Sequence, residues 1–168
     1  MFNKIENLSE IEFIEVFGNI FENASWIAKQ LYKQKPFENF KDLSKKMISI
    51  FDEVDDQNKL KILNSHPDLA DKTKVGSLTP DSNKEQSDAG LDKCSQTEFN
   101  EFKNLNVKYK NKFGFPFIIA VQGKNKSEIL INFKKRVLSD QKIEFDEAIT
   151  QVKKIANLRL EELKNSFI

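Results

Sequence analysis

The sequence has little of what several protein classes require. It contains one cysteine, Cys94, among 168 residues, so an internal disulfide is excluded. With one histidine as well, no Cys/His cluster is available to hold structural zinc. No run approaches 18 apolar residues, so a membrane-spanning helix is not expected. The opening residues MFNKIENLSE lack the charged and apolar regions of a secretory signal, and we therefore expect a reduced, cytoplasmic protein.

An excess of charge of either sign is also missing. Lys and Arg number 27 against 26 Asp and Glu, which leaves a formal net charge of +1. This balance disfavours general electrostatic binding of nucleic acid or of an anionic membrane. Arg136 and Arg159 are the only arginines, so any clamp that uses paired hydrogen bonds on a carboxylate or planar amide needs one of them. Similarly, His66 is the single candidate for imidazole acid–base chemistry.

What remains is typical of a helical globular protein. Hydrophobic residues make up 39% and charged residues 32%, and the length fits one domain, which we assign to residues 1–168. The 15 phenylalanines predict a Phe-rich core. Capping-box patterns at 9–12, 82–85 and 95–98 predict helix starts. The expected fold is all-α, a single compact domain of about eight helices. Apolar periodicity places these helices over about 10–17, 23–34, 40–54, 56–65, 82–90, 96–113, 127–138 and 143–164.

The most apolar stretch, residues 113–121, breaks the helical pattern. Its periodicity does not distinguish a buried strand from a short helix. Gly114 is a candidate helix stop, and Gly114 and Pro116 together predict an irregular or extended entry followed by buried backbone. Buried backbone N–H and C=O groups need partners, and a ligand can be one of them.

Several polar residues are candidates for chemistry. His66 follows a predicted helix end, and Ser82, Glu85 and Gln86 share one helix face. Each observation has a structural alternative. In these alternatives His66 caps helix-end carbonyls, Ser82 and Glu85 form only a capping box, and Arg159 is a solvated surface residue. Gln86 is not explained by a cap. A hydroxyl, a carboxylate and an amide on one face suit a polar heterocycle that carries several N–H and C=O groups.

Taken together, six segments resemble one known family. They are Ser65-His66-Pro67-Asp68-Leu69-Ala70, Leu78-Thr79-Pro80-Asp81-Ser82, Glu85-Gln86-Ser87-Asp88-Ala89-Gly90-Leu91, Leu105-Asn106-Val107-Lys108-Tyr109, Lys112-Phe113-Gly114-Phe115-Pro116-Phe117-Ile118 and Ile155-Ala156-Asn157-Leu158-Arg159-Leu160. In this order and spacing they resemble the 2-oxo-4-hydroxy-4-carboxy-5-ureidoimidazoline (OHCU) decarboxylases of urate breakdown. The resemblance extends from about Asn7 to Leu163.

The resemblance implies a single all-helical domain that is usually a homodimer and needs neither metal nor organic cofactor. The implied partner is the small-molecule substrate OHCU, converted to (S)-allantoin and carbon dioxide, with no nucleic acid and no membrane. The family places His66 and Glu85 in catalytic roles. It places in substrate binding Pro67, Ser82, Gln86, Arg159 and the backbone of Phe117, Ile118 and Ile119.

Two other functions stay open from the sequence. One is a non-catalytic helical interaction module. The other is a hydrolase of a related ureido compound, in which the same His/Glu pair acts on water. The residues at 165–168 are not a peroxisomal Ser-Lys-Leu signal, which favours a cytoplasmic, bacterial-type member.

Overall fold

The computed structural model describes residues 2–71 and 78–167, and within these ranges every regular element is helical. The predicted all-α fold is therefore confirmed. Over the described residues the elements are α1 (Phe2–Glu6), α2 (Glu10–Phe17), α3 (Ser25–Tyr32), α4 (Phe40–Asp52), α5 (Asp56–Asn64), α6 (Pro80–Asp88), the 3-10 helix η2 (Leu91–Lys93), α7 (Gln96–Phe113), α8 (Lys126–Arg136) and α9 (Gln141–Ser166). None of the helices in these ranges is long and apolar enough to cross a membrane.

Most predicted helices lie within a few residues of their expected bounds. The capping boxes of α2 and α7 both form, with Ser9 and Ser95 as the N-cap residues. Two short elements, α1 and η2, were not predicted from the sequence. Each is five residues or fewer, too short for an apolar period to be visible. The predicted irregular region between α5 and α6 is confirmed at 66–71 and 78–79, and residues 72–77 lie outside the described residues.

The chain divides into two compact units. The first consists of residues 1–65 and 153–168, and it holds α1 to α5 and the later part of α9. In this unit α3 packs against both α2 and α4. Its core is rich in Phe, with the Phe13 and Phe17 rings 4.6 Å apart and the Phe21 and Phe51 rings stacked at 4.8 Å.

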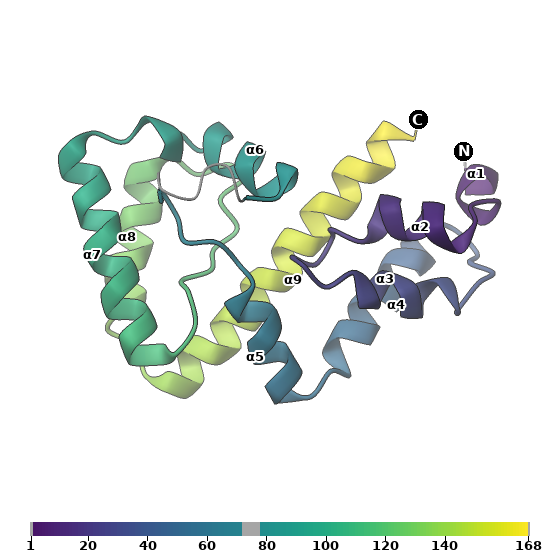
Figure 1. Ribbon diagram of the computed structural model, residues 1–168, viewed down its shortest axis with the longest axis horizontal. Helices are drawn as coiled ribbons and strands as arrows, with labels where there is room; N and C mark the ends of the chain where they lie inside the picture. Colours follow the sequence, from purple (N-terminus) through teal and green to yellow (C-terminus); the bar gives the residue numbers. More distant parts are fainter. Residues whose placement is uncertain (1, 72–77, 168) are drawn as a thin grey trace. The chain divides into compact units, whose positions relative to one another are not determined.

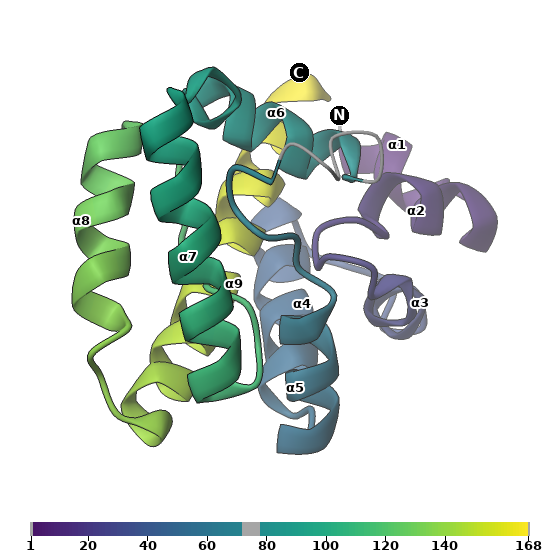
Figure 2. The same cartoon turned by 60° about the vertical axis from the view of Figure 1, so that its left-hand side comes forward.

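The second unit consists of residues 66–152 and holds α6, η2, α7, α8 and the first part of α9. Helices α7 and α8 pack side by side, and the connection between them runs back along the unit, so both helices point the same way (Figures 1 and 2). Tyr109 of α7 is fully buried at the centre of this core. Its ring makes edge or tilted contacts with Phe113, Phe115, Phe117 and Phe133. The prediction of a Phe-rich core is confirmed.

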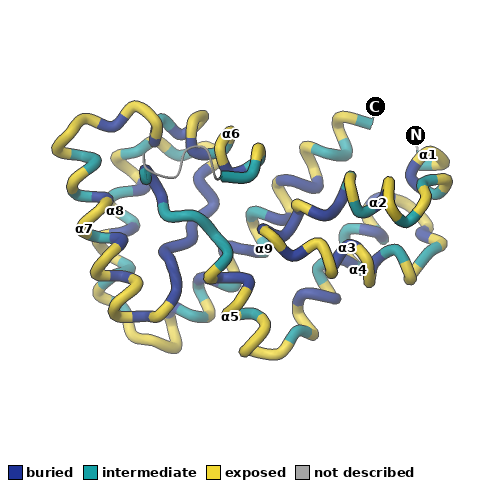
Figure 3. Tube along the Cα trace, in the orientation of Figure 1, coloured by how far each residue is buried: buried dark blue, intermediate teal, exposed yellow. Residues whose placement is uncertain are grey.

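The connection after α7 is the irregular buried segment that the sequence predicts. Gly114 ends α7 with φ +80°, a left-handed conformation that glycine adopts without steric cost. Residues 115–121 are all buried, as the dark blue trace in Figure 3 shows, yet they form neither helix nor strand. Polar side chains must therefore satisfy this backbone in place of regular structure.

Candidate functional site

Helix α6 begins two residues earlier than its predicted capping box. Thr79 is the N-cap residue, its hydroxyl accepts a hydrogen bond from the backbone N–H of Ser82 at 3.2 Å, and Pro80 occupies the first turn. The prediction that Ser82 and Glu85 form the capping box is therefore wrong. The Thr-Pro pair defines the helix start, and the polar residues three and six positions further on are not required as caps.

The buried face of α6 carries the polar residues that were predicted as a site. Ser82 and Gln86 are buried, and Glu85 is half-buried. The side-chain amide of Gln86 forms hydrogen bonds to the chain segment after His66 through both its oxygen and its nitrogen. Its Oε1 accepts from the backbone N–H of Ala70 at 3.1 Å, and its Nε2 donates to the carbonyl of Asp68 at 3.3 Å. Gln86 thereby attaches α6 to this chain segment.

Helix α7 holds the same segment with two further contacts. Asn106 donates through Nδ2 to the carbonyl of Leu69 at 3.0 Å, and Lys110 forms an ion pair with Asp68 at 2.7 Å. Ala70 has φ +56°, a region that residues with a Cβ seldom adopt. Gln86 accepts the N–H of this residue, and Asn106 donates to the carbonyl of the residue before it. The two hydrogen bonds therefore hold a backbone conformation that is unfavourable by itself.

His66 and Pro67 lie directly between this anchored segment and helix α5. The helix ends with Ser65 as its C-cap residue, as the proline predicts. Ser65 Oγ lies 2.7 Å from the carbonyl of Ile62 and 2.9 Å from that of Glu22. His66 is half-buried and is the first residue of the second unit. Its backbone is thus tied at a helix end on one side and at Asp68 to Ala70 on the other.

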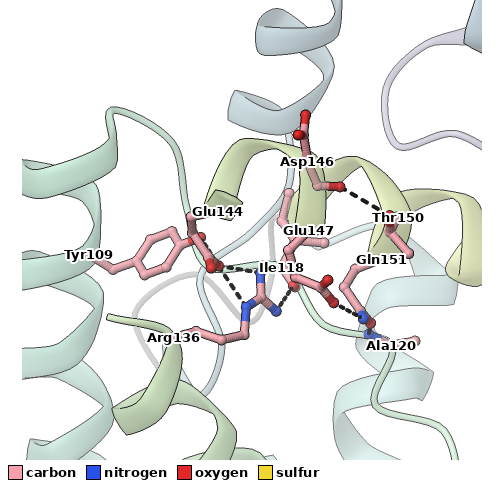
Figure 4. A network of polar contacts seen from close by, with 9 residues as sticks. All are labelled: Tyr109, Ile118, Ala120, Arg136, Glu144, Asp146, Glu147, Thr150 and Gln151. Atoms are coloured by element: carbon pink, nitrogen blue, oxygen red, sulfur yellow. Dashed lines mark hydrogen bonds and ion pairs between the residues drawn. The ribbon is translucent and has the colours of Figure 1, made fainter. Parts of the chain in front are cut away.

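The Phe117–Ile119 segment is held by side chains from α8 and α9 (Figure 4). The Arg136 guanidinium donates to the carbonyl of Ile118 at 2.7 Å, and Gln151 accepts from the N–H of Ala120 at 2.9 Å. Arg136 also pairs with the buried Glu144, with Nε 2.6 Å from its Oε1. The opposite charges and the hydrogen bond to Ile118 offset part of the cost of removing these two groups from water.

The hydroxyl of Tyr109 completes this cluster by donating to Glu144 Oε1 at 2.5 Å. Burial raises the pKa of Tyr109 far above its ordinary value, and the Glu144 carboxylate raises it further. The phenol is therefore a permanent donor at physiological pH. No sequence pattern pointed to Glu144, and Arg136 stood out only as one of two arginines. Scarcity of arginine was the one signal that pointed to Arg136.

Arg159 lies in the first unit, on the later part of α9. It is 5% exposed, and the alternative of a solvated surface arginine is wrong. Its Nη1 lies 3.0 Å from a carboxylate oxygen of Glu22 and donates to the carbonyl of Asn19 at 2.9 Å. These contacts hold Nη1 of the buried guanidinium between a carboxylate and a carbonyl, and an anchored guanidinium is suited to recognition through paired hydrogen bonds.

One cavity adjoins the anchored segment within the second unit. It has a volume of about 340 Å³, and its described lining residues are Asp68, Ala70, Asp71, Phe99, Lys103, Asn106, Val107 and Lys110. Among the described lining residues none belongs to the predicted site. Outside residues 72–77 and the two terminal residues, no group of three or more His, Cys, Asp or Glu is arranged to hold a metal ion.

Within the described residues, the fold and these side chains define an all-helical protein in which the segment after the single histidine is held by an amide from a neighbouring helix. The family model described as OHCU decarboxylase matches residues 6–161, and the chain belongs to this family. Every residue predicted for the site falls within the matched range.

Individual relatives agree with this assignment. The 2-oxo-4-hydroxy-4-carboxy-5-ureidoimidazoline decarboxylase of Halalkalicoccus jeotgali is 34% identical over 162 residues, which cover 95% of this chain and 90% of that protein. The uric acid degradation bifunctional protein of Bacillus sp. (strain TB-90) is 39% identical over 95% of this chain, but the chain spans only 31% of its length. A crystal structure of OHCU decarboxylase in the presence of (S)-allantoin superposes with a TM-score of 0.69 at 25% identity. The superposition covers 93% of this chain and 98% of that one.

Proposed function

We propose that this protein decarboxylates OHCU to (S)-allantoin and carbon dioxide in urate degradation, and that residues 1–168 act as one catalytic domain. The observation that carries the proposal is the family match over residues 6–161, within which all nine predicted site residues are present. The anchoring of the chain after His66 to Gln86 supports it, since a reacting imidazole requires a fixed backbone.

The structure of the substrate explains why His66 and Glu85 suffice for this decarboxylation without an organic cofactor. The substrate carries a carboxylate and a hydroxyl on one ring carbon, next to a C=N bond. When the bond to the carboxylate breaks and carbon dioxide leaves, the electron pair passes to the neighbouring C=N bond. The nitrogen of that bond takes up a proton, which leaves an enol at the carbon that lost the carboxylate. A second proton then adds to one face of the former C=N carbon while the enol hydroxyl gives up its proton to become the ring carbonyl, and the face of this addition sets the S product. This built-in electron acceptor replaces the one that an organic cofactor supplies to other decarboxylases.

In this proposal His66 is the proton shuttle, which takes the proton of the hydroxyl on that ring carbon, and Glu85 orients and polarises the imidazole. General acid–base catalysis of this kind contributes typically about 10²–10⁴-fold. Ser82, Gln86 and Pro67 set the face of the substrate, and Arg159 binds it by paired hydrogen bonds. Within the described residues the backbone N–H groups of Phe117, Ile118 and Ile119 form no hydrogen bond, which supports a substrate-binding role for this backbone.

The test follows the fate of freshly made OHCU, generated from urate with urate oxidase and hydroxyisourate hydrolase. Circular dichroism then reports the formation of (S)-allantoin after the protein is added. We expect rapid growth of the signal with wild type, and a loss of at least about 10²-fold with His66→Asn and with Glu85→Gln. Asn83→Ala is the matched control, because Asn83 lies on the exposed face of the same helix.

Other outcomes identify the alternatives. Release of ammonia or urea without carbon dioxide would indicate a hydrolase of a ureido compound. Slow racemic allantoin at the same rate with and without protein would indicate a non-catalytic interaction module. Wild-type turnover and stereochemistry in His66→Asn would remove His66 from the mechanism while leaving the activity established.

Two further features belong to the proposal. We expect a homodimer, which sedimentation at several protein concentrations tests, and a constant monomer mass would contradict it. We also expect the protein in the cytoplasm, which fractionation of the producing cells tests. Recovery in a membrane or exported fraction would contradict that location.

A further inference from the structure

The buried cluster of Tyr109, Glu144 and Arg136 ends on the main chain of the irregular segment (Figure 4). Its side chains come from α7, α9 and α8. Tyr109 and Glu144 are 0% and 1% exposed, and the Arg136 guanidinium lies 4.5 Å from the centre of the Phe117 ring. The only arginine of this unit is therefore oriented by a carboxylate, an aromatic face and one carbonyl.

The hydrogen bond from Arg136 sets the direction of the next N–H group. The peptide bond between Ile118 and Ile119 is planar and trans, because the one cis bond found in the described chain is Lys35–Pro36. In a trans peptide the C=O and N–H point in opposite directions. Since the carbonyl of Ile118 points at Arg136, the N–H of Ile119 points away from Arg136.

Gln151 sets the next peptide in the same way. Its Oε1 accepts the N–H of Ala120 at 2.9 Å, while its Nε2 donates to Glu147 at 2.8 Å, which holds the amide in one orientation. The carbonyl of Ile119 belongs to the same peptide as the N–H of Ala120, so it points away from Gln151. Ile119 thus has one donor and one acceptor whose directions are fixed by neighbours, and neither forms a hydrogen bond to another described residue.

We propose that Arg136 and Gln151 are positioning residues that aim the N–H and C=O of Ile119 at the substrate. This rests on the proposed function, in which the Phe117–Ile119 backbone binds OHCU. An adjacent donor and acceptor complement a ureido or cyclic amide group, which offers a C=O beside an N–H. Tyr109 and Glu144 act through Arg136, because they hold its guanidinium in the plane that reaches Ile118.

The planar guanidinium explains why position 136 requires an arginine for this role. Nε bonds Glu144 while Nη1 bonds Ile118, and the planar group stacks over Phe117. A lysine keeps the charge beside Glu144 but has a single nitrogen and no plane. We therefore expect Arg136→Lys to keep the ion pair with Glu144 and to lose the hydrogen bond that orients the Ile118–Ile119 peptide.

The experiment compares Arg136→Lys and Gln151→Met with wild type in the OHCU assay, after each variant is shown to be folded by its melting temperature. We expect kcat/KM to fall about tenfold or more, mainly through a higher KM, because the N–H and C=O of Ile119 no longer have a fixed orientation and bind the substrate less tightly. Tyr109→Phe keeps the ring and the ion pair, and we expect a smaller effect in the same direction. Gln141→Ala is the matched control. It removes a similar hydrogen bond, from Nε2 to the carbonyl of Phe113 at 3.0 Å, on the far side of Gly114, and KM should not change.

A second readout does not depend on turnover. In ¹H–¹⁵N spectra, titration with (S)-allantoin should shift the Ile119 amide of wild type and of Gln141→Ala. The shift should be reduced in Arg136→Lys and in Gln151→Met. If both of these variants are folded and have the wild-type KM and the wild-type Ile119 shift, the positioning role is wrong even though the decarboxylase activity stands. If wild type does not turn over OHCU, the proposed function fails instead, and the unliganded Ile119 resonance still reports whether Arg136 sets that peptide.

Discussion

The side-chain carbonyl of Gln86 and the backbone N–H of Ala70 meet at 3.1 Å, although 16 residues separate them in the chain. Ala70 is buried and has φ +56°, so this hydrogen bond holds a backbone conformation that alanine disfavours. The same amide reaches the carbonyl of Asp68. Gln86 therefore shapes the segment after His66 in addition to any contact with a ligand.

Replacing Gln86 by methionine should lower both stability and activity. Methionine has similar length but leaves the N–H of Ala70 buried without its acceptor, which costs about 1–3 kcal/mol. Urea denaturation measures that loss. Gln86→Glu retains an acceptor for Ala70 and should lose less stability than Gln86→Met. Equal stability of wild type and Gln86→Met would show that the hydrogen bond does not hold this segment.

The start of α6 makes a prediction about Thr79. Because its hydroxyl caps the helix at Ser82, Thr79→Ala should destabilise the protein by about 0.5–2 kcal/mol. Thr79→Ser keeps the oxygen and should stay close to wild type. Thermal unfolding of the three proteins under one set of conditions tests this. A loss of the same size in both variants would assign the effect to the methyl group and not to the cap.

Glu98, at the start of α7, makes stability depend on pH. A hydrogen bond from Lys126, followed by that from the N–H of Ser95, lowers the pKa of this carboxyl from 4.5 to about 2. A carboxyl whose pKa is depressed by folding stabilises the protein fully above its unfolded pKa, and this contribution is lost as the pH falls toward the folded pKa. The contribution should therefore disappear between about pH 4.5 and pH 2.

The measurement is the melting temperature of wild type and Glu98→Gln from about pH 7 down to about pH 2. The gap between the two proteins should be constant above about pH 5 and should close at the acidic end. High salt should narrow the gap at neutral pH, because Lys126 and Glu98 are both partly exposed and salt screens the pair. A gap that widens toward acidic pH would contradict the direction of the pKa shift.

Phe133 tests the core of the second unit. Its ring stacks on Phe117 with centroids 3.9 Å apart, and the side chain is fully buried. Phe133→Ala should cost about 3–5 kcal/mol of unfolding free energy through lost contacts and the remaining cavity. Ile131→Ala, on the same helix but at a residue 67% exposed, should change stability by less than about 0.5 kcal/mol. Urea denaturation of both variants provides the comparison, and similar losses would mean that the Phe117–Phe133 stack is not a main support.

Local structure was predictable where its hydrogen bonds close within a few residues. The capping boxes at Ser9 and Ser95 and the helix stop at Gly114 each depend on neighbours three or four positions away, and all three form as predicted. The error at α6 has the same origin. Two cap patterns overlap there, and Thr79 with Pro80 was the stronger one because proline is preset for the first helical turn.

Family resemblance, carried by ordered motifs, pointed to His66, Glu85 and the other site residues, and their roles are for the kinetic experiments to test. The sequence could not pair Arg136 with the carbonyl of Ile118, or Arg159 with that of Asn19, 140 residues away. Such contacts depend on which helix faces are buried against each other. The periodicity of apolar residues along the sequence does not show which group will lie beside a buried guanidinium. The sequence by itself determined the longer helices, the capping boxes at Ser9 and Ser95, and the break at 113–121. Tertiary structure alone decided which polar groups hold the irregular backbone, because buried N–H and C=O groups take whatever partner the packed helices bring within reach.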